Sequence, residues 1–440
     1  MSQPQLLFAA VADDDTGASD LAGMFADQGV RVVLILDAEP GEDLAPWIGG
    51  AHGVVFATAA RALPRELAVA RTLAAFDCAK ALDPRLYLLK YCSTFDSTEE
   101  GNIGPTLDAA MATLGENFTI AFPALPVNGR TTYCGYHFVK GQLLSDSPMR
   151  LHPLNPMTNP NLVDFLGRQT SRRVGLTPYE AVRMGPAAIL AHWAQLRQEK
   201  VEISIVDCLE DAHAAAICDA SCELRLASGG SAFGMHLPAA WRRRGWLGEA
   251  QADPLAGCKR TPGRGRLVAA GSCSVATSRQ NAWLEARGAT VHSIDAVAIL
   301  DRGEAPAAEQ IAQELAAGQT VLVKTRSSPE ALEASRAWAA ARGLTAQQMG
   351  LQLARRIASL IAESVRMQPP EILVSAGGES SSALCRALGV RALAIGKNIQ
   401  PGVPLCVPIS GAAVPLVLKS GNFGSEDFYR AAFEAATRLG

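Results

Sequence analysis

Three consecutive aspartates are the first residues of this chain that could do chemistry. Asp13, Asp14 and Asp15 stand in "VADDDTGASDLAG", after the apolar run "LLFAA", where a buried strand should end and a helix begin. Neighbouring carboxylates repel, so we expect a cationic group or a substrate hydroxyl to meet them. They could orient a hydroxyl, accept its proton or hold Mg²⁺. The simpler alternative is that one aspartate caps the helix and the others are solvated.

A second polar stretch, "KYCSTFDSTEEGNIGP", follows the apolar run "RLYLL". It offers a cation for a carboxylate and several groups for hydroxyls, which suits a polyhydroxy acid. An N-capped helix with solvated side chains is the alternative. Arg61 follows another apolar run and is an anion-binding candidate, although a lone arginine is more often a surface residue. The candidate substrate-binding residues are Asp13, Asp14, Arg61, Lys90, Ser93, Asp96 and Ser97.

Glycine and serine recur between an expected strand and an expected helix at three places in the second half. The stretches are "EILVSAGGESSSALCRAL", "AAGSCSVATSRQ" and "LKSGNFGSEDF". Glycine lets the backbone approach a ligand, and free helix N–H groups favour an anion. Such turns could gather at the carboxyl edge of one sheet, where open α/β sheets bind ligands. Serine-capped turns are the alternative. Neither the Walker pattern nor a proper G-x-G-x-x-G is present, so no standard P-loop or dinucleotide fold is expected.

The order of apolar runs and helical patterns predicts an α/β fold in two domains. Each domain should hold a mainly parallel sheet flanked by helices, with a cleft between the domains. Residues 123–173 are irregular, and "GYHFVKGQLL" within them indicates an ordered excursion such as a hairpin. The segment "GEAQADPLAGCKRTPGRGR" resembles a linker. We therefore place the domains at residues 1–255 and 262–440.

Composition excludes several classes of protein. The 440 residues exceed the usual size of one core, and 48% hydrophobic with 19% charged residues is an ordinary globular balance. A net charge of −3 does not suggest nucleic acid, no apolar run approaches a membrane span, and the N-terminus lacks the basic region of a signal peptide. The 10 Cys contain no C-x-x-C and the 7 His no ligand spacing, so reduced cytoplasmic thiols are expected and a zinc site is not.

Six stretches together resemble the four-carbon acid sugar kinase family. They are "ADDDTGASDLA", "KYCSTFDSTEEGNIGP", "NGRTTYCGYHFV", "HPLNPMTNPNLV", "SAGGESSSAL" and "LKSGNFGSEDF", in the family's order over nearly the whole chain. Within the family, "KYCSTFDST" and "HPLNPMTNPNL" are most similar to the 3-oxo-tetronate kinase branch.

This resemblance implies a function and a division of labour between the domains. The N-terminal domain would bind the sugar acid and the C-terminal domain ATP, with Mg²⁺, to phosphorylate the terminal (4-) hydroxyl, most simply of 3-oxo-tetronate. Asp14 and Asp13 are the catalytic candidates, and no metal ligand is assigned. A homo-oligomer is left open. The resemblance places ATP at Ser272, Ser274, Gly377, Gly378, Glu379, Ser380 and Gly421.

Two departures concern the substrate side of the pattern. Asp15 stands where the family usually has an aromatic residue, and Ala60 where a serine usually precedes the arginine. A related acid, such as threonate, erythronate or a branched oxo-acid, is therefore an alternative substrate.

Two other functions are alternatives from different classes. "DDDTG" superficially resembles the D-x-D-x-T signature of aspartyl-phosphate phosphatases, but Thr16 stands one place too early. The second alternative is a non-catalytic sugar-acid sensor, but the sequence contains no DNA-binding element that would support it. A kinase agrees best with the pattern, because phosphoryl transfer needs positioning, a cation for phosphates and a group that orients the hydroxyl.

Overall fold

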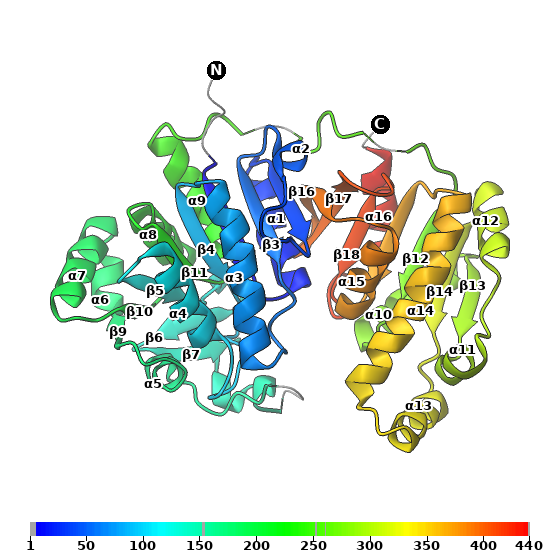
Figure 1. Cartoon of the computed structure of the whole chain (residues 1–440), viewed down its shortest axis with the longest axis horizontal. Helices are drawn as coiled ribbons and strands as arrows, with labels where there is room; N and C mark the ends of the chain where they lie inside the picture. The colour runs from blue at the N-terminus through cyan, green and yellow to red at the C-terminus, as the bar shows by residue number, and fades with distance from the viewer. Residues whose placement is uncertain (1–5, 152–154, 251–252, 260, 439–440) are drawn as a thin grey trace. The chain divides into compact units, whose positions relative to one another are not determined.

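The computed structural model describes residues 6–151, 155–250, 253–259 and 261–438. It divides the chain into two compact units, Met1–Ala252 and Asp253–Gly440 (Figure 1). Both units contain a sheet with helices packed against it, so the predicted α/β class is confirmed. Leu255, at the end of the first predicted domain, is 5% exposed and packs in the core of the second unit.

The N-terminal unit is built on a parallel sheet with the strand order β2-β3-β1-β4-β11-β5-β10-β9. Its first four strands are buried along their whole length, because helices pack over the sheet. Helix α9 contacts both α1 and α8, and α3 contacts α4. The strands are β1 Phe8–Ala12, β2 Val32–Leu36, β3 Gly53–Ala57, β4 Leu86–Lys90, β5 Thr119–Phe122, β9 Val174–Thr177, β10 Ile203–Val206 and β11 Leu226–Gly229. The α-helices are α1 Asp15–Asp27, α2 Ala45–Ile48, α3 Arg65–Ala81, α4 Ile103–Leu114, α5 Leu162–Gly167, α6 Tyr179–Arg183, α7 Pro186–Gln198, α8 Asp211–Ser221 and α9 Ala232–Arg243.

The irregular excursion of the sequence is an ordered antiparallel sheet, as predicted. It comprises β6 (Arg130–Tyr133), β7 (Tyr136–Val139) and β8 (Gln142–Leu143). Short 3₁₀ helices flank it at Pro126–Asn128, Leu144–Asp146 and Pro148–Leu151. The family stretch "HPLNPMTNPNLV" follows, and its first residues, 152–154, lie outside the described residues.

The C-terminal unit has the strand order β13-β14-β12-β15-β18-β17-β16. Along this order, the neighbouring strands β13, β14, β12, β15 and β18 pair in parallel. Strand β17 pairs antiparallel with both β18 and β16. Helix α14 contacts α11, α12, α13 and α15, and α10 contacts α16. The strands are β12 Arg266–Ala270, β13 Thr290–Ile294, β14 Thr320–Thr325, β15 Ile372–Ala376, β16 Ala392–Gln400, β17 Val403–Pro408 and β18 Leu416–Lys419. The helices are α10 Val275–Glu285, α11 Ala296–Arg302, α12 Ala308–Ala316, α13 Pro329–Ala341, α14 Ala346–Met367, α15 Gly378–Ala387 and α16 Phe428–Thr437.

Local sequence signals explain where the helices of both units begin and end. The Asp14 side chain caps α1, and Thr345 with Gln348 forms a capping box at α14. Gly115 ends α4 in the left-handed conformation, with φ at 71°. Among the described residues, no helix is both long and apolar enough to cross a membrane.

His137 connects the excursion to the parallel sheet of the N-terminal unit. Its buried ring lies 3.0 Å (Nδ1) from the Thr132 hydroxyl and 2.9 Å (Nε2) from the Ser93 carbonyl, so Nε2–H donates to Ser93 and Nδ1 accepts from Thr132. Burial lowers the pKa of His137 to about 4, which keeps the ring neutral near pH 7. The excursion thereby fixes the loop that follows β4.

The burial of His137 predicts a loss of stability in acid. Its folded pKa of about 4 lies below the unfolded value of about 6.5, so the unfolded state binds more protons between these pH values. The free energy of unfolding should therefore fall as the pH drops from about 6.5 to 4. Denaturant titrations of wild type and His137→Gln at pH 7 and 4.5 measure this, and the variant should lose less. Equal losses in both proteins would contradict the prediction.

Candidate functional site

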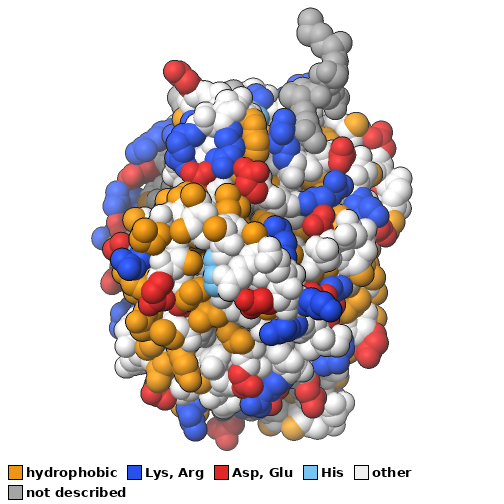
Figure 2. All heavy atoms as spheres, turned by 90° about the vertical axis from the view of Figure 1, so that its left-hand side faces the viewer, with side chains coloured by type: hydrophobic (Ala, Val, Ile, Leu, Met, Phe, Trp, Pro, Cys, Tyr) orange, Lys and Arg blue, Asp and Glu red, His pale blue; other side chains and the backbone are white. Residues whose placement is uncertain are grey.

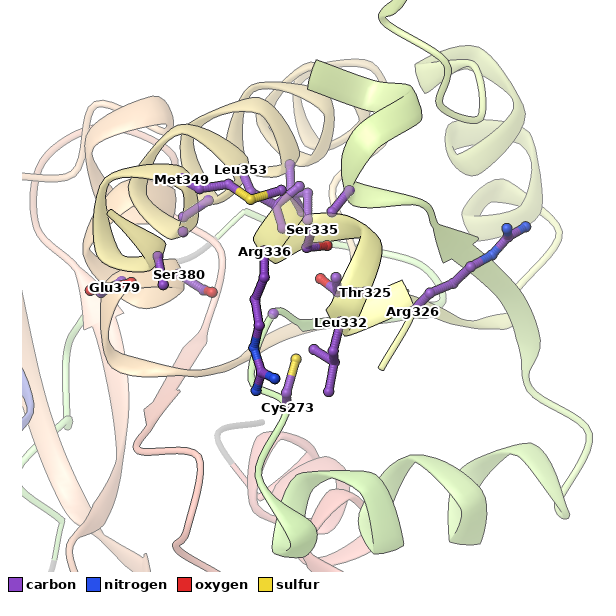
Figure 3. Close-up of a pocket in the computed structure, with 16 residues that line it drawn as sticks. Cys273, Thr325, Arg326, Leu332, Ser335, Arg336, Met349, Leu353, Glu379 and Ser380 are labelled. Atoms are coloured by element: carbon purple, nitrogen blue, oxygen red, sulfur yellow. The ribbon is translucent and has the colours of Figure 1, made fainter. Parts of the chain in front are cut away.

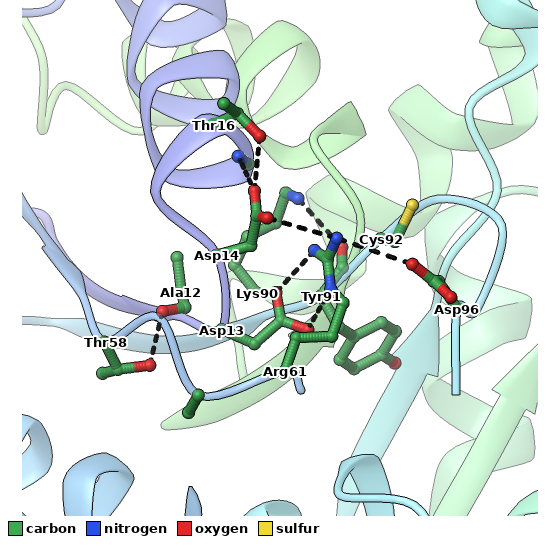
Figure 4. A network of polar contacts seen from close by, with 12 residues as sticks. Ala12, Asp13, Asp14, Thr16, Thr58, Arg61, Lys90, Tyr91, Cys92 and Asp96 are labelled. Atoms are coloured by element: carbon green, nitrogen blue, oxygen red, sulfur yellow. Dashed lines mark hydrogen bonds and ion pairs between the residues drawn. The ribbon is translucent and has the colours of Figure 1, made fainter. Parts of the chain in front are cut away.

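A guanidinium holds the aspartates at the end of β1 together (Figure 4). Arg61 binds Asp13 through two hydrogen bonds, Nε–Oδ2 at 2.9 Å and Nη2–Oδ1 at 2.8 Å. Its Nη1 lies 3.4 Å from an Asp14 oxygen and 3.7 Å from an Asp96 oxygen. The cation that the clustered carboxylates require is therefore Arg61, which the sequence singled out only as a candidate for substrate binding.

Asp14 uses its two carboxylate oxygens differently. Oδ1 accepts hydrogen bonds of 2.6 Å from both the Thr16 hydroxyl and the Gly17 N–H, which makes Asp14 the cap of α1. Oδ2 faces Arg61 across 3.4 Å. Burial would raise the pKa of Asp14, but Arg61, the two hydrogen bonds and Lys90 outweigh burial and lower it. The carboxylate is thus charged at neutral pH, and the capping role leaves one oxygen for another partner.

The other predicted substrate residues gather around Arg61 but are largely enclosed. Lys90, Asp96 and Ser97 are 3%, 8% and 5% exposed, and Lys90 Nζ donates to the Tyr91 carbonyl at 2.9 Å. Together with Asp13 and Arg61 they line a cavity of only about 20 Å³. Ser93 is partly exposed. In this structure, a ligand can reach Asp14, Arg61 and Ser93 more readily than the enclosed residues.

Asp20 is a site residue that the sequence reasoning missed. Ser231, which follows the two glycines at the end of β11, donates to Asp20 Oδ2 at 2.5 Å. Burial raises the pKa of Asp20, although Lys90 and the Ser231 hydrogen bond act against it. Nearby, Arg130 carries a buried Nε without a partner. The sequence signal that could have pointed to this place is "SGGS" after an apolar run. It resembles the glycine and serine turns in the second half of the chain.

The three glycine and serine turns of the C-terminal unit meet at the carboxyl ends of β12, β15 and β18. Ser272 N–H donates to the Ala376 carbonyl at 3.0 Å, and Gly377 N–H donates to the Lys419 carbonyl at 2.9 Å. The Ser274 hydroxyl closes the group by donating to the Gly421 carbonyl at 2.6 Å. The sequence predicted that these turns could gather, and the structure brings them together.

Close contacts explain why these turns need glycine. A Cβ at Gly421 would lie 2.1 Å from the Ser272 hydroxyl oxygen, and one at Gly271 would lie 2.1 Å from the Ser380 hydroxyl oxygen. Gly377 has a φ of 128°, which L side chains rarely adopt. The serine hydroxyls therefore occupy the space that side chains would fill.

Helix α15 presents its N-terminus to this group of turns. Its N-cap is Gly377, which provides no side-chain hydrogen bond to the first-turn N–H groups. Unsatisfied N–H groups at a helix N-terminus favour an anion. Glu379 lies in this first turn, and burial raises its pKa. The geometry suits phosphate groups.

A cavity of about 250 Å³ adjoins the turns (Figure 3). Cys273, Glu379 and Ser380 line it on the side of the turns. The Thr325 hydroxyl, buried and without a hydrogen-bond partner, belongs to the opposite wall at the end of β14. Half of the remaining lining residues are apolar side chains of α13 and α14, namely Leu332, Ala346, Met349, Leu353, Ala354 and Ile357. Arg326, Ser335 and Arg336 also line the cavity. Such a lining, with a few polar groups, suits an aromatic ring.

The sequence reasoning also missed the polar residues that hydrogen-bond to the carbonyl groups of the turn after β18. Thr277 donates to the Gly421 carbonyl at 2.8 Å, and the Gln280 amide lies within 3.1 Å of the carbonyls of Phe423, Gly424 and Ser425. Lys419 ends β18 and is fully buried. Their sequence context is that of ordinary helix and strand residues.

No metal cluster is found among the described residues, and their side chains form no basic stripe on the face shown in Figure 2. No three His, Cys, Asp or Glu side chains of the described residues are grouped to hold a metal ion. On the face shown in Figure 2, basic and acidic side chains of the described residues are interspersed, without a continuous basic stripe.

Comparison with known proteins agrees with this division into two sites. A model of a sugar-binding N-terminal domain matches residues 8–237, and a model of a nucleotide-binding C-terminal domain matches residues 267–429. The chain is 42% identical to a 3-oxo-tetronate kinase from Cupriavidus necator, covering 99% of this chain and 97% of that protein. It is 40% identical to a 3-oxo-tetronate kinase from Pseudomonas fluorescens, covering 98% and 97%.

Solved structures show the same fold. A crystal structure of a Salmonella typhimurium LT2 protein superposes with a TM-score of 0.80 at 33% identity, covering 97% of this chain and 98% of that one. A Haemophilus influenzae protein of the family DUF1537 gives a TM-score of 0.77 at 31% identity, covering 97% and 99%. The chain therefore belongs to the four-carbon acid sugar kinase family, with a sugar-binding N-terminal domain and a nucleotide-binding C-terminal domain.

Proposed function

We propose that this protein is an ATP-dependent kinase that phosphorylates the 4-hydroxyl of 3-oxo-tetronate. The observation that carries the proposal is the meeting of three glycine and serine turns with a free helix N-terminus, because this arrangement suits phosphate groups. The names of the relatives support the sugar acid. A cytoplasmic location, where ATP is available and thiols stay reduced, agrees with the 10 scattered cysteines, which include no C-x-x-C pair.

The nucleotide would bind to the C-terminal unit with its phosphates at the turns. The proposed phosphate contacts are the N–H groups of Gly378, Glu379 and Ser380 and the hydroxyl of Ser272. Ser274, whose hydroxyl donates to the Gly421 carbonyl, would hold the turn in place. Gly377 and Gly421 would let the backbone approach. The adjoining apolar cavity would take the base, with the Thr325 hydroxyl as a hydrogen-bond partner.

The sugar acid would bind to the N-terminal unit beside Asp14. In this proposal, Asp14 Oδ2 orients the hydroxyl to be phosphorylated and accepts its proton, while Asp13 assists through Arg61. Lys90 would supply the positive charge for the acid's carboxylate, and Ser93 would bind a hydroxyl. Asp96 and Ser97, which are enclosed like Lys90, would shape this site. Transfer then needs mainly positioning and charge stabilisation.

Mg²⁺ would accompany the nucleotide. Mg²⁺ in kinases is commonly bound by one or two carboxylates together with substrate phosphates and water. Glu379 is the carboxylate in the first turn of α15, so the residues present fit this mode. Bound Mg²⁺ would neutralise phosphate charge.

An aspartyl-phosphate phosphatase is a weaker explanation. Asp13 is held by two hydrogen bonds from Arg61, and Thr16 stands one place too early for the D-x-D-x-T signature. The relatives' names do not favour it either.

The proposed reaction can be tested directly. Purified protein should release ADP from Mg-ATP only when a sugar acid is present, with the highest kcat/KM for 3-oxo-tetronate among that acid, threonate and erythronate. A coupled assay measures ADP, and ³¹P NMR should show a phosphate ester at C4. ADP release without any acid, or none with every acid, would contradict the proposal.

Asp14→Asn tests the role of the aspartate. Asparagine caps a helix about as well as aspartate, so the melting temperature should change little. Loss of the charged acceptor should lower kcat by about 10²- to 10⁴-fold while KM for ATP stays similar. Asp15→Asn removes the same charge from the next residue and serves as the control. Near-normal turnover of Asp14→Asn would mean that Asp14 is only a cap.

Gly421→Ala tests the nucleotide site. The new Cβ would lie 2.1 Å from the Ser272 and 3.2 Å from the Ser274 hydroxyl oxygens, so both side chains must move. Because small misplacements of binding groups are costly, KM for ATP should rise by roughly 10- to 100-fold. Gly167→Ala is the control, since its Cβ meets nothing within 4 Å. An unchanged KM for ATP in a folded Gly421→Ala protein would argue against nucleotide binding at these turns.

A further inference from the structure

Lys419 is a buried ammonium group that has no counter-charge at ion-pair distance among the residues that the structure describes. The residue is 0% exposed, at the carboxyl end of β18. Its Nζ lies 3.3 Å from the Thr277 hydroxyl, 3.1 Å from the Ser420 carbonyl and 3.4 Å from the Gly421 carbonyl. The ion pairs found among the described residues do not include it.

Such an arrangement is unfavourable for folding alone. Burial lowers the pKa of Lys419 to about 8, so the amine is still mostly charged near neutral pH. A buried charge without a partner costs stability, and an apolar side chain of similar length would fill the space without that cost. Lys324 in the same sheet shows the usual solution, since its Nζ pairs with Glu285 at 2.5 Å. The position of Lys419 therefore calls for a partner that the described residues do not provide.

The groups around Lys419 direct positive electrostatic potential toward the turn that contains Gly421 and Asn422. The Gly421 carbonyl accepts hydrogen bonds from Ser274, Thr277 and Lys419, so it faces the buried donors. In a planar trans peptide the next N–H points the opposite way, which directs the Asn422 N–H away from these donors. The Lys419 carbonyl also accepts from Gly377 N–H, the N-cap of α15. Lys419 thus contacts two of the three turns.

We propose that Lys419 is a positioning residue whose charge balances the phosphates of the bound nucleotide. Lys419 acts through the Gly421–Asn422 peptide. It does not touch the phosphates directly, because its side chain is enclosed. Bound phosphate supplies the counter-charge that the described part of the chain does not offer. This inference rests on the proposed function of the C-terminal unit in binding ATP.

Lys419→Met tests the inference by removing the charge while keeping the length. We expect ADP to bind at least 10-fold more weakly by calorimetry at pH 7, and adenosine, which lacks phosphate, to bind within twofold of wild type. The melting temperature of the ligand-free variant should equal or exceed that of wild type, because an unpaired buried charge is gone. Lys324→Met removes a paired charge from the same unit and should leave ADP affinity within twofold.

The outcomes separate this inference from the proposed function. Wild-type protein that binds neither ADP nor adenosine would overturn nucleotide binding itself. Wild type that binds ADP, with Lys419→Met binding it equally well, would overturn only the role of Lys419. A variant that melts lower or fails to fold would show that Lys419 is a structural residue, and equal weakening of ADP and adenosine would also overturn the charge-balancing role.

Discussion

Burial of both faces of a parallel sheet is the constraint on which both candidate sites depend. In each unit helices pack over the strands, and many strands are apolar along their length. Polar chemistry is then confined to the strand ends, where the backbone leaves the sheet and helix N-termini begin. Asp13 and Lys90 follow or end strands of one sheet, and Gly377 and Lys419 do so in the other. The positions of both sites are thus set by the packing of helices on the sheet as much as by individual residues.

The two sites balance their charges in opposite ways. In the N-terminal unit one guanidinium faces three carboxylates, so acidic groups are in excess and each is held in a fixed direction. In the C-terminal unit no ion pair among the described residues includes the buried Lys419 ammonium, and no side chain caps the N-terminus of α15. An acidic site suits hydroxyl groups that must lose a proton, and an electropositive one suits phosphates. The difference agrees with the division between acceptor and donor of a phosphoryl group.

The sequence predicted those features that depend on local pattern. The α/β class, the hairpin excursion and the three glycine and serine turns all follow from short stretches, and the structure contains them. Arg61 was named, but its hydrogen bonds to Asp13 could not be, because the two residues meet only when β1 and β3 pair. Lys419 was overlooked for a related reason. A lysine that ends an apolar strand usually extends into solvent, and its enclosure depends on α10 and the turn after β18.

The chain passes only once between its two units, after Ala252. Every strand of the N-terminal sheet is therefore complete in sequence before the C-terminal unit begins. During synthesis at about 5 to 20 residues per second, the second unit takes on the order of ten to forty seconds to follow. The sugar-binding unit can use this interval to pair β1 with β3 and β4, and to bury its core while the ribosome still holds the rest. The contiguous layout thus lets the order of translation separate two folding problems that would otherwise compete for the same apolar strands.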